Sequence, residues 1–183
     1  IADIVPMIGE NRLLVRHGLK ILPKTTNTGL RALQQVTGMS GEATAMDVGF
    51  RIGPRINAAG RMDAPEKALA ILITDDEDEA AMLAGELDGY NRERQSEEIK
   101  IREEALAQLN GFDPGQEPVI VLGSREWHPG VVGIVASRLM RQYYKPTFVI
   151  AIDENGLGKG SGRSIEGVSL VEAGDRDGLG YRD

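Results

Sequence analysis

The chain has 183 residues, no cysteine and a formal net charge of −7. The lack of cysteine excludes disulfide bonds and thiolate metal sites, and it is typical of a protein from a reducing cytoplasm. No apolar run approaches the roughly 20 residues that span a bilayer, so we expect a cytoplasmic protein with no membrane partner. The length suffices for two small domains, and because the first residue is Ile1 we expect a fragment of a longer chain.

The negative charge is concentrated in one segment. Residues 75–104 carry twelve acidic and four basic side chains, so the rest of the chain is close to neutral. Two groups of basic residues lie outside this segment: Arg51, Arg55, Arg61 and Lys67, and Arg138, Arg141, Lys145, Lys159 and Arg163. A polyanionic partner is therefore compatible with the acidic composition.

The first elements are an expected strand end and several helices. Residues 1–6 are apolar and β-branched up to Pro6, which would end a central strand. Asp3 is the carboxylate in this run, where it needs a metal ion, a cation or several N–H donors. Mg²⁺ and Mn²⁺ take carboxylate ligands, but neither His17 nor His128 stands in a ligand-like pattern with an aspartate. These residues alone assemble no metal site, and a capping or turn role for Asp3 stays open.

Helical spacing of apolar residues predicts a pair of helices at residues 28–36 and 43–50, and a short helix at 65–72. Between them, residues 53–61 have glycine at both ends and an early proline, which predicts an irregular loop. This loop carries Arg55, Asn57 and Arg61, which are suited to phosphate contacts. The alternative is structural, with the arginines paired to the acidic segment.

Residues 74–109 predict one long helix. Thr74 and Glu77 form a capping-box pattern, and no proline interrupts the run. Apolar stripes occur at both ends, whereas residues 91–98 are wholly polar. Such a middle is typical of an exposed bridge between domains. Two helices with a polar joint are the alternative.

The second half alternates strands and a helix. Strand patterns occur at residues 119–122 and 147–152, and helical periodicity occurs at 131–143. This order predicts a small α/β domain. We therefore expect an α/β fold with three parts: residues 1–73, a connecting helix at 74–110, and a small domain at 116–183.

Trp127 and His128 directly precede the helix expected at residues 131–143. His128 would lie near the positive end of that helix, which suits an anion contact, and Trp127 could stack on a base. The alternative is that Trp127 is a core residue and that His128 is a local cap.

Residues 158–164 read Gly158-Lys-Gly-Ser-Gly-Arg-Ser164. Glycines let backbone N–H groups converge on an anion, and Arg163 adds a bidentate fork. A nucleotide P-loop is excluded, because Asp153 and Gly160 occupy positions that need glycine and a hydroxyl residue. A plain tight hairpin is the alternative.

Six segments in this order resemble the RecJ family of bacterial single-strand-specific exonucleases, in the DHH phosphoesterase superfamily. They are Ile1-Ala-Asp-Ile-Val-Pro6, Gly9-Glu-Asn-Arg12, Gly53-Pro-Arg-Ile-Asn-Ala-Ala-Gly-Arg61, Glu86-Leu-Asp-Gly-Tyr-Asn-Arg92, Trp127-His-Pro-Gly-Val-Val-Gly133 and Gly158-Lys-Gly-Ser-Gly-Arg-Ser164. The resemblance covers about residues 1–173. It implies the end of a metal-bearing DHH domain, a long helix and a DHH-associated domain, with DNA in the cleft between the domains.

The resemblance also implies site residues. Asp3 matches the last aspartate ligand of a catalytic two-metal centre for Mn²⁺ or Mg²⁺, whose other ligands would lie before Ile1. Ser161 and Arg163 match positions that hold the 5′-terminal phosphate, and Arg61 and Arg55 match substrate-contacting arginines. The predicted substrate-binding set is completed by Asn57, His128, Lys159 and Ser164.

The implied activity is 5′→3′ hydrolysis of phosphodiester bonds in single-stranded DNA, in DNA repair and recombination. The implied partners are single-stranded DNA with a 5′-phosphate end and repair proteins such as a helicase and a single-strand-binding protein. We expect the fragment alone to be inactive, and the small domain to be incomplete because residues 174–183 depart from the family pattern. Two alternatives are a DHH-type phosphatase of short oligonucleotides or nucleotide bisphosphates, and a non-catalytic nucleotide-binding module.

Overall fold

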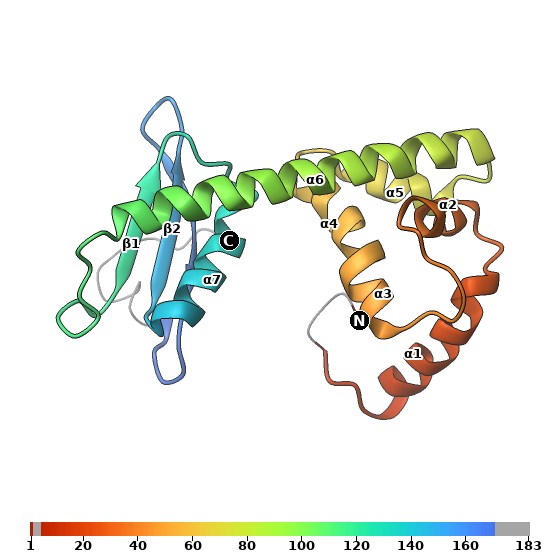
Figure 1. Ribbon diagram of the computed structural model, residues 1–183, viewed down its shortest axis with the longest axis horizontal. Coiled ribbons are helices and arrows are strands. Elements are labelled where there is room, and N and C mark those ends of the chain that lie inside the picture. Colours follow the sequence, from red (N-terminus) through yellow and green to blue (C-terminus); the bar gives the residue numbers. More distant parts are fainter. Residues whose placement is uncertain (2–4, 171–183) are drawn as a thin grey trace. The chain divides into compact units, whose positions relative to one another are not determined.

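The computed structural model describes Ile1 and residues 5–170. The chain divides into two compact units at residues 94 and 95. Unit 1 is helical, whereas unit 2 combines a helix with a three-stranded sheet (Figure 1). The division falls within a single helix, α6, which runs from Glu77 to Gln108. None of the described helices is long and apolar enough to cross a membrane.

Unit 1 contains short helices followed by the first part of α6. In chain order they are α1 (Gly9–Ile21), the 3₁₀ turn η1 (Leu22–Lys24), α2 (Thr28–Val36), α3 (Ala45–Asp47), the π-helical turn η2 (Val48–Ile52), α4 (Gly53–Arg61) and α5 (Pro65–Ile73). The helices predicted at residues 28–36 and 65–72 are confirmed as α2 and α5. The helix predicted at 43–50 is only partly present, because α3 is short and leads into η2.

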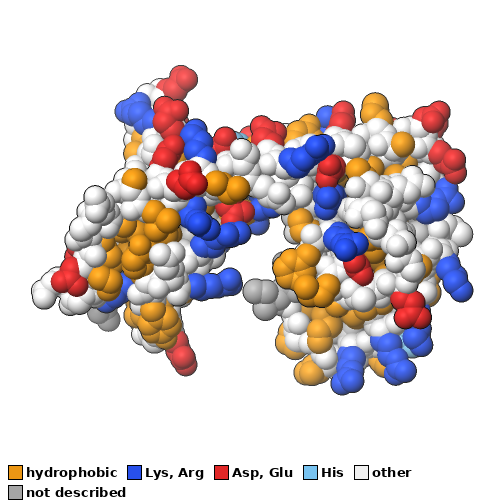
Figure 2. Space-filling model, viewed as in Figure 1, with side chains coloured by type: hydrophobic (Ala, Val, Ile, Leu, Met, Phe, Trp, Pro, Cys, Tyr) orange, Lys and Arg blue, Asp and Glu red, His pale blue; other side chains and the backbone are white. Residues whose placement is uncertain are grey.

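Helix α1 was not predicted from the sequence. Pro6 precedes it and Gly9 is its first residue, and both residue types indicate a loop. None of its residues is buried. Leu13 and Leu14 are 55% and 70% exposed. Orange and blue side chains are exposed together on the part of unit 1 that contains α1 (Figure 2).

The irregular loop predicted at residues 53–61 is wrong, because these residues form helix α4. Pro54 lies in the first turn, where its missing N–H needs no partner and its fixed φ suits a helix. The chain also enters α4 directly from η2. Ala58 and Ala59 are fully buried, which gives α4 a packed face.

Helices α2, α4, α5 and α6 share the apolar core of unit 1. Its buried residues are Ala32, Leu33, Ile52, Ala59, Ile71, Ala80, Leu83, Ala84 and Leu87. The closest approach is at Gly29 of α2, where a Cβ would lie 1.6 Å from the carbonyl oxygen of Ile71 in α5. No other residue fits there without moving α2 away from α5.

Helix α6 is one uninterrupted helix, as predicted, but the predicted capping pair of Thr74 and Glu77 is wrong. Asp76 caps the helix, since its Oδ1 accepts a hydrogen bond from the backbone N–H of Glu79 at 2.8 Å. Thr74 Oγ1 instead accepts a hydrogen bond from the N–H of Asp76 at 3.2 Å and donates to the Glu79 carboxylate. Thr74 therefore orders the turn that precedes the helix.

Unit 2 contains a sheet with strand order β1-β2-β3 and one crossover helix, α7 (Val132–Tyr143). Strand β1 (Ile120–Ser124) is parallel to β2 (Thr147–Ile152), and β3 (Gly158–Arg163) is antiparallel to β2. The predicted α/β character and both predicted strands are confirmed, with β1 shifted by one residue at its start.

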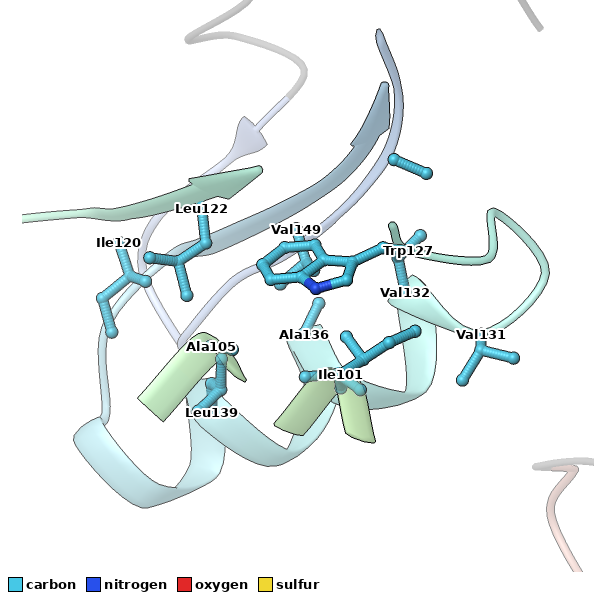
Figure 3. Packing of buried hydrophobic residues seen from close by; sticks show 12 residues of the cluster. Ile101, Ala105, Ile120, Leu122, Trp127, Val131, Val132, Ala136, Leu139 and Val149 are labelled. Carbon is cyan, nitrogen blue, oxygen red and sulfur yellow. The ribbon is translucent and has the colours of Figure 1, made fainter. Parts of the chain in front are cut away.

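The core of unit 2 lies between the sheet, α7 and the second part of α6. Its buried residues are Ile101, Ala105, Ile120, Leu122, Trp127, Val131, Val132, Val135, Ala136, Leu139, Val149 and Ala151. The Trp127 ring lies among these side chains (Figure 3) and is 4% exposed. Its Nε1 donates to Glu104 Oε2 at 2.7 Å. Trp127 is therefore a core residue, and the stacking alternative is wrong.

The polar stretch at residues 91–98 is not exposed on all sides, contrary to the prediction. Asn91 and Glu98 are only 4% and 5% exposed. Asn91 Oδ1 accepts a hydrogen bond from Arg94 Nη2 at 3.1 Å, and the Glu98 carboxylate pairs with Arg138 of α7. A partner on the same helix for Asn91 and a partner on α7 for Glu98 allow these polar groups to be buried, and the polarity of the sequence does not reveal this.

Candidate anion-binding site

The glycines of β3 make room for the side chains of β2. Gly160 and Gly162 stand opposite Ile150 and Phe148. A Cβ at Gly160 would lie 2.8 Å from Ile150 Cγ1, and one at Gly162 would lie 2.9 Å from Phe148 Cε1. No glycine of β3 has a positive φ. The predicted cradle of converging backbone N–H groups is therefore not formed by these glycines, which belong to a regular antiparallel strand. Phosphate binding by this segment stays a prediction.

The polar residues of β3 lie on the other face of the sheet, because side chains alternate along a strand. Lys159, Ser161 and Arg163 stand opposite the buried residues Ala151, Val149 and Thr147. This is the face that α7 covers, so Ser161 and Arg163 lie against the start of α7.

Three hydrogen bonds hold the exposed guanidinium of Arg163. Its Nε donates to Ser137 Oγ on α7 at 3.0 Å. Its Nη1 donates to Ser161 Oγ at 2.8 Å and to the carbonyl oxygen of Gly162 at 2.7 Å. Nη2 makes no hydrogen bond to any residue that the structure describes. Two N–H groups of a fixed cation are therefore free for a ligand.

Gly133, in the first turn of α7, borders this guanidinium. A Cβ at Gly133 would lie 3.0 Å from Ser161 Oγ and 3.3 Å from Arg163 Nη2. Within the described part of the chain, no side chain caps the start of α7. The N–H groups of Val132 and Ile134 already donate to the carbonyl oxygens of His128 and Val131, so this end favours an anion mainly through the helix dipole. The site thus combines a fixed cation, a hydroxyl group and a helix N-terminus.

Arg163 keeps its positive charge uncompensated. Among the described residues, no carboxylate lies within 4.0 Å of its guanidinium. Its partners are two hydroxyl groups and a carbonyl, which orient the group without neutralising it. An anion is the ligand that this arrangement can bind, with a phosphate oxygen accepting from Nη2.

The other residues predicted near this site make local contacts. His128 is half-buried, and its Nδ1 accepts a hydrogen bond from the backbone N–H of Gly130 at 3.1 Å, which agrees with the local-cap alternative. Ser164 Oγ donates to the carbonyl oxygen of Val168 at 2.8 Å. Lys159 is exposed. Direct ligand contacts by these three residues stay predictions.

Arg55 has a carboxylate partner in unit 1. Its Nε and Nη2 lie 2.9 and 2.8 Å from Asp88 Oδ1 on α6, and its Nη1 donates to the carbonyl oxygen of Arg51 at 2.7 Å. Arg92 Nη2 reaches the second oxygen of Asp88 at 3.1 Å. The side chains of Arg55 and Asp88 are each only 17% exposed. The structural alternative thus describes Arg55, and a substrate contact by it stays a prediction.

The Glu86–Arg92 segment of α6, which carries part of the resemblance, makes a second ion pair within unit 1. Lys67 Nζ of α5 lies 2.9 Å from Glu86 Oε2 and 5.4 Å from the centre of the Tyr90 ring. Hydrogen bonding to Glu86, and then to Tyr90, raises the pKa of Lys67 above its usual range. This segment therefore anchors α6 to α4 and α5.

Asn57 and Arg61 are both exposed and lie four residues apart on α4. This spacing puts them on one face of the helix. A phosphate contact by this face stays a prediction.

Asp3 lies outside the described residues. Among the residues that are described, no group of three or more His, Asp or Glu side chains could hold a metal ion. The described residues therefore do not fit a two-metal centre.

Two residues of the site were missed by the sequence predictions. Gly133 ends the Trp127–Gly133 motif, so its place in that motif was a signal. Ser137 follows one helical turn later, and its Oγ donates to the carbonyl oxygen of Gly133 at 3.0 Å. Nothing in the sequence shows that Ser137 contacts β3.

Comparisons with known proteins identify relatives of this chain. Residues 116–175 match the DHHA1 domain. The chain is 43% identical over 177 residues to the single-stranded-DNA-specific exonuclease RecJ of Bacillus subtilis, which covers 94% of this chain and 22% of the relative. It is 44% identical over 173 residues to RecJ of Thermus thermophilus, which covers 94% of this chain and 24% of the relative. The chain thus spans about a quarter of the length of these relatives.

Solved structures match as well. The crystal structure of Thermus thermophilus RecJ in complex with Mg²⁺ matches with a TM-score of 0.86 and 44% identity, over 100% of this chain and 28% of that chain. The crystal structure of exonuclease RecJ bound to manganese matches with a TM-score of 0.82 and 44% identity, over 95% of this chain and 42% of that chain. The chain is therefore homologous to part of the RecJ single-stranded-DNA-specific exonucleases, and it includes their DHHA1 domain.

Proposed function

We propose that this chain binds the 5′-terminal phosphate of single-stranded DNA for a 5′→3′ exonuclease. Arg163 and Ser161 bind the phosphate at the start of α7. The homology to RecJ supports the substrate class, because those relatives are single-stranded-DNA-specific exonucleases. Because of the resemblance, we also propose that the protein acts in bacterial DNA repair and recombination in the cytoplasm. Its proposed partners there are a helicase and a single-strand-binding protein.

The observation that carries the proposal is the uncompensated Arg163 guanidinium. It is fixed by three hydrogen bonds, one of them from Nη1 to Ser161, and Nη2 adjoins the first turn of α7. A terminal phosphate carries more charge than an internal phosphodiester, and it offers several oxygens as acceptors. A phosphorylated end therefore gains more from this site than a hydroxyl end.

The remaining contacts of the strand are proposed to involve its backbone. Asn57 and Arg61 on one exposed face of α4, and Lys159 on β3, are suited to phosphates without regard to base. Such binding weakens as salt displaces it.

Hydrolysis requires groups besides the described residues. The relatives in the solved structures carry Mg²⁺ or Mn²⁺, and a metal ion of this kind activates water for attack on a phosphodiester. Asp3 is proposed as one ligand. The described residues do not form the centre, so the contribution proposed for them is substrate binding.

Two affinities test the proposal. Fluorescence anisotropy measures binding of one single-stranded oligodeoxynucleotide with either a 5′-phosphate or a 5′-hydroxyl end. We expect the wild-type chain to prefer the phosphorylated end about tenfold, and Arg163→Ala to abolish that preference. Arg141→Ala removes the same charge from the exposed surface of α7 and should weaken both affinities equally. Equal wild-type affinities, or an unchanged preference in Arg163→Ala, would contradict the proposal.

A further inference from the structure

Arg163 is an exposed side chain that reaches one residue outside its own strand. Its Nη1 bonds are to Ser161 and Gly162 of β3, whereas its Nε bonds to Ser137 of α7, which is 26 positions away in sequence. A free arginine side chain samples many rotamers, and fixing it costs conformational entropy. The Nε bond ties the guanidinium to α7.

Ser137 is itself held in one orientation. Its hydroxyl donates to the carbonyl oxygen of Gly133 at 3.0 Å. A hydroxyl group has a single proton, so with that proton committed Ser137 Oγ offers only lone pairs to Arg163. Two consecutive hydrogen bonds result: Arg163 Nε donates to Ser137 Oγ, and Ser137 Oγ donates to the Gly133 carbonyl.

These hydrogen bonds determine which N–H groups of Arg163 remain for a ligand. With Nε and Nη1 committed, the two N–H groups of Nη2 are left, next to the position where a Gly133 side chain would stand. Because the guanidinium is planar, fixing Nε and Nη1 also fixes the plane in which Nη2 lies. A phosphate then meets a donor whose orientation is already set, and binding loses less entropy.

We propose that Ser137 is a positioning residue for Arg163, an inference that rests on the phosphate recognition proposed above. Ser137 contributes through the orientation of the guanidinium and does not itself contact the phosphate. Removing its hydroxyl should lower the preference for 5′-phosphorylated ends and leave the affinity for 5′-hydroxyl ends unchanged. The carbonyl oxygen of Gly133 accepts the hydrogen bond from the Ser137 hydroxyl, and the missing side chain of Gly133 keeps the space beside Nη2 open.

The test compares Ser137→Ala and Ser137→Thr with the control Ser96→Ala, which changes an exposed position of α6. All variants are made in the full chain. Alanine favours a helix, and circular dichroism confirms that each variant is folded. We expect Ser137→Ala to reduce the tenfold phosphate preference about two- to fivefold, a smaller loss than in Arg163→Ala. Ser137→Thr keeps a hydroxyl that can bond the carbonyl four residues earlier, so it should restore the preference. Ser96→Ala should match the wild type.

A second measurement follows Arg163 directly. The NMR signal of the Arg163 Nε–H should shift in unliganded Ser137→Ala and return toward its wild-type position in Ser137→Thr. A full phosphate preference in Ser137→Ala, equal losses on both DNA ends, or no recovery in Ser137→Thr would overturn the inference while leaving phosphate recognition by Arg163 intact. If the wild-type chain shows no preference, the proposed function fails and the role of Ser137 fails with it.

Discussion

Arg55 in unit 1 and Arg163 in unit 2 are both fixed by three polar contacts, but the contacts differ in charge. Two of the three contacts of Arg55 are to the Asp88 carboxylate. Arg163 is held by the hydroxyl groups of Ser137 and Ser161 and by a carbonyl. Arg55 is also mostly buried, whereas Arg163 is exposed.

The difference separates a structural arginine from a binding arginine. A carboxylate satisfies the guanidinium and cancels its charge, so Arg55 joins α4 to α6. Hydroxyl groups accept hydrogen bonds from the guanidinium but do not cancel its charge, so Arg163 keeps a charge that an anion can neutralise. Both arginines occur in motifs of the same resemblance, and the charge of their partners distinguishes them.

The largest effect is expected when a carboxylate is placed beside Arg163. Ser161→Asp should pair with the guanidinium as Asp88 pairs with Arg55, and it should repel an incoming phosphate. We expect the affinity for 5′-phosphorylated DNA to fall at least about 100-fold, because like charges in a contact cost several kcal/mol. Anisotropy titrations at fixed salt measure this loss.

Ser161→Asn is the matched variant for this change, with nearly the same shape and no charge. It should retain most of the phosphate preference, since the amide oxygen can still accept from Arg163 Nη1. If Ser161→Asp binds phosphorylated DNA as well as Ser161→Asn does, charge compensation does not distinguish the two arginines.

A smaller effect is expected from the converse change in unit 1. Asp88→Asn removes the charge that neutralises Arg55 and Arg92. We expect the free energy of unfolding to fall by about 1–3 kcal/mol, between the values for exposed and buried pairs. Urea denaturation monitored by circular dichroism measures this fall.

Glu93→Gln is the control for Asp88→Asn, because it removes one negative charge from an exposed position on the same helix. Its effect on stability should be within about 0.5 kcal/mol. Equal stability of the two variants would show that the Asp88 ion pairs contribute nothing to unit 1.

The strands and most helices could be predicted because their sequences carry local signals. β2 has a continuous apolar run, and α2 and α5 have apolar residues at helical spacing. Helix α4 was missed because Gly53 and Pro54 indicate a loop when the preceding turn is unknown. The burial of Glu98 was missed because its partner Arg138 lies on another helix, α7.

The candidate site was predictable only where residues share a strand. Ser161 and Arg163 are two positions apart, so the strand period places them on one face. Ser137 and Gly133 reach them through the packing of α7 on the sheet, which no local pattern encodes. In the same way, Asp88 lies 33 positions from Arg55, so the sequence left both phosphate contact and ion pairing open for Arg55.

Chemical-shift mapping tests the central claim most directly, since it observes both arginines in one experiment. The full chain is titrated with a 5′-phosphorylated oligodeoxynucleotide and, separately, with its 5′-hydroxyl counterpart. The Arg163 Nε–H and the Gly133 amide should shift with the phosphorylated strand and shift far less with the hydroxyl strand, while the Arg55 Nε–H stays in place. Identical shifts with both strands, or a phosphate-dependent shift at Arg55 without one at Arg163, would contradict the account.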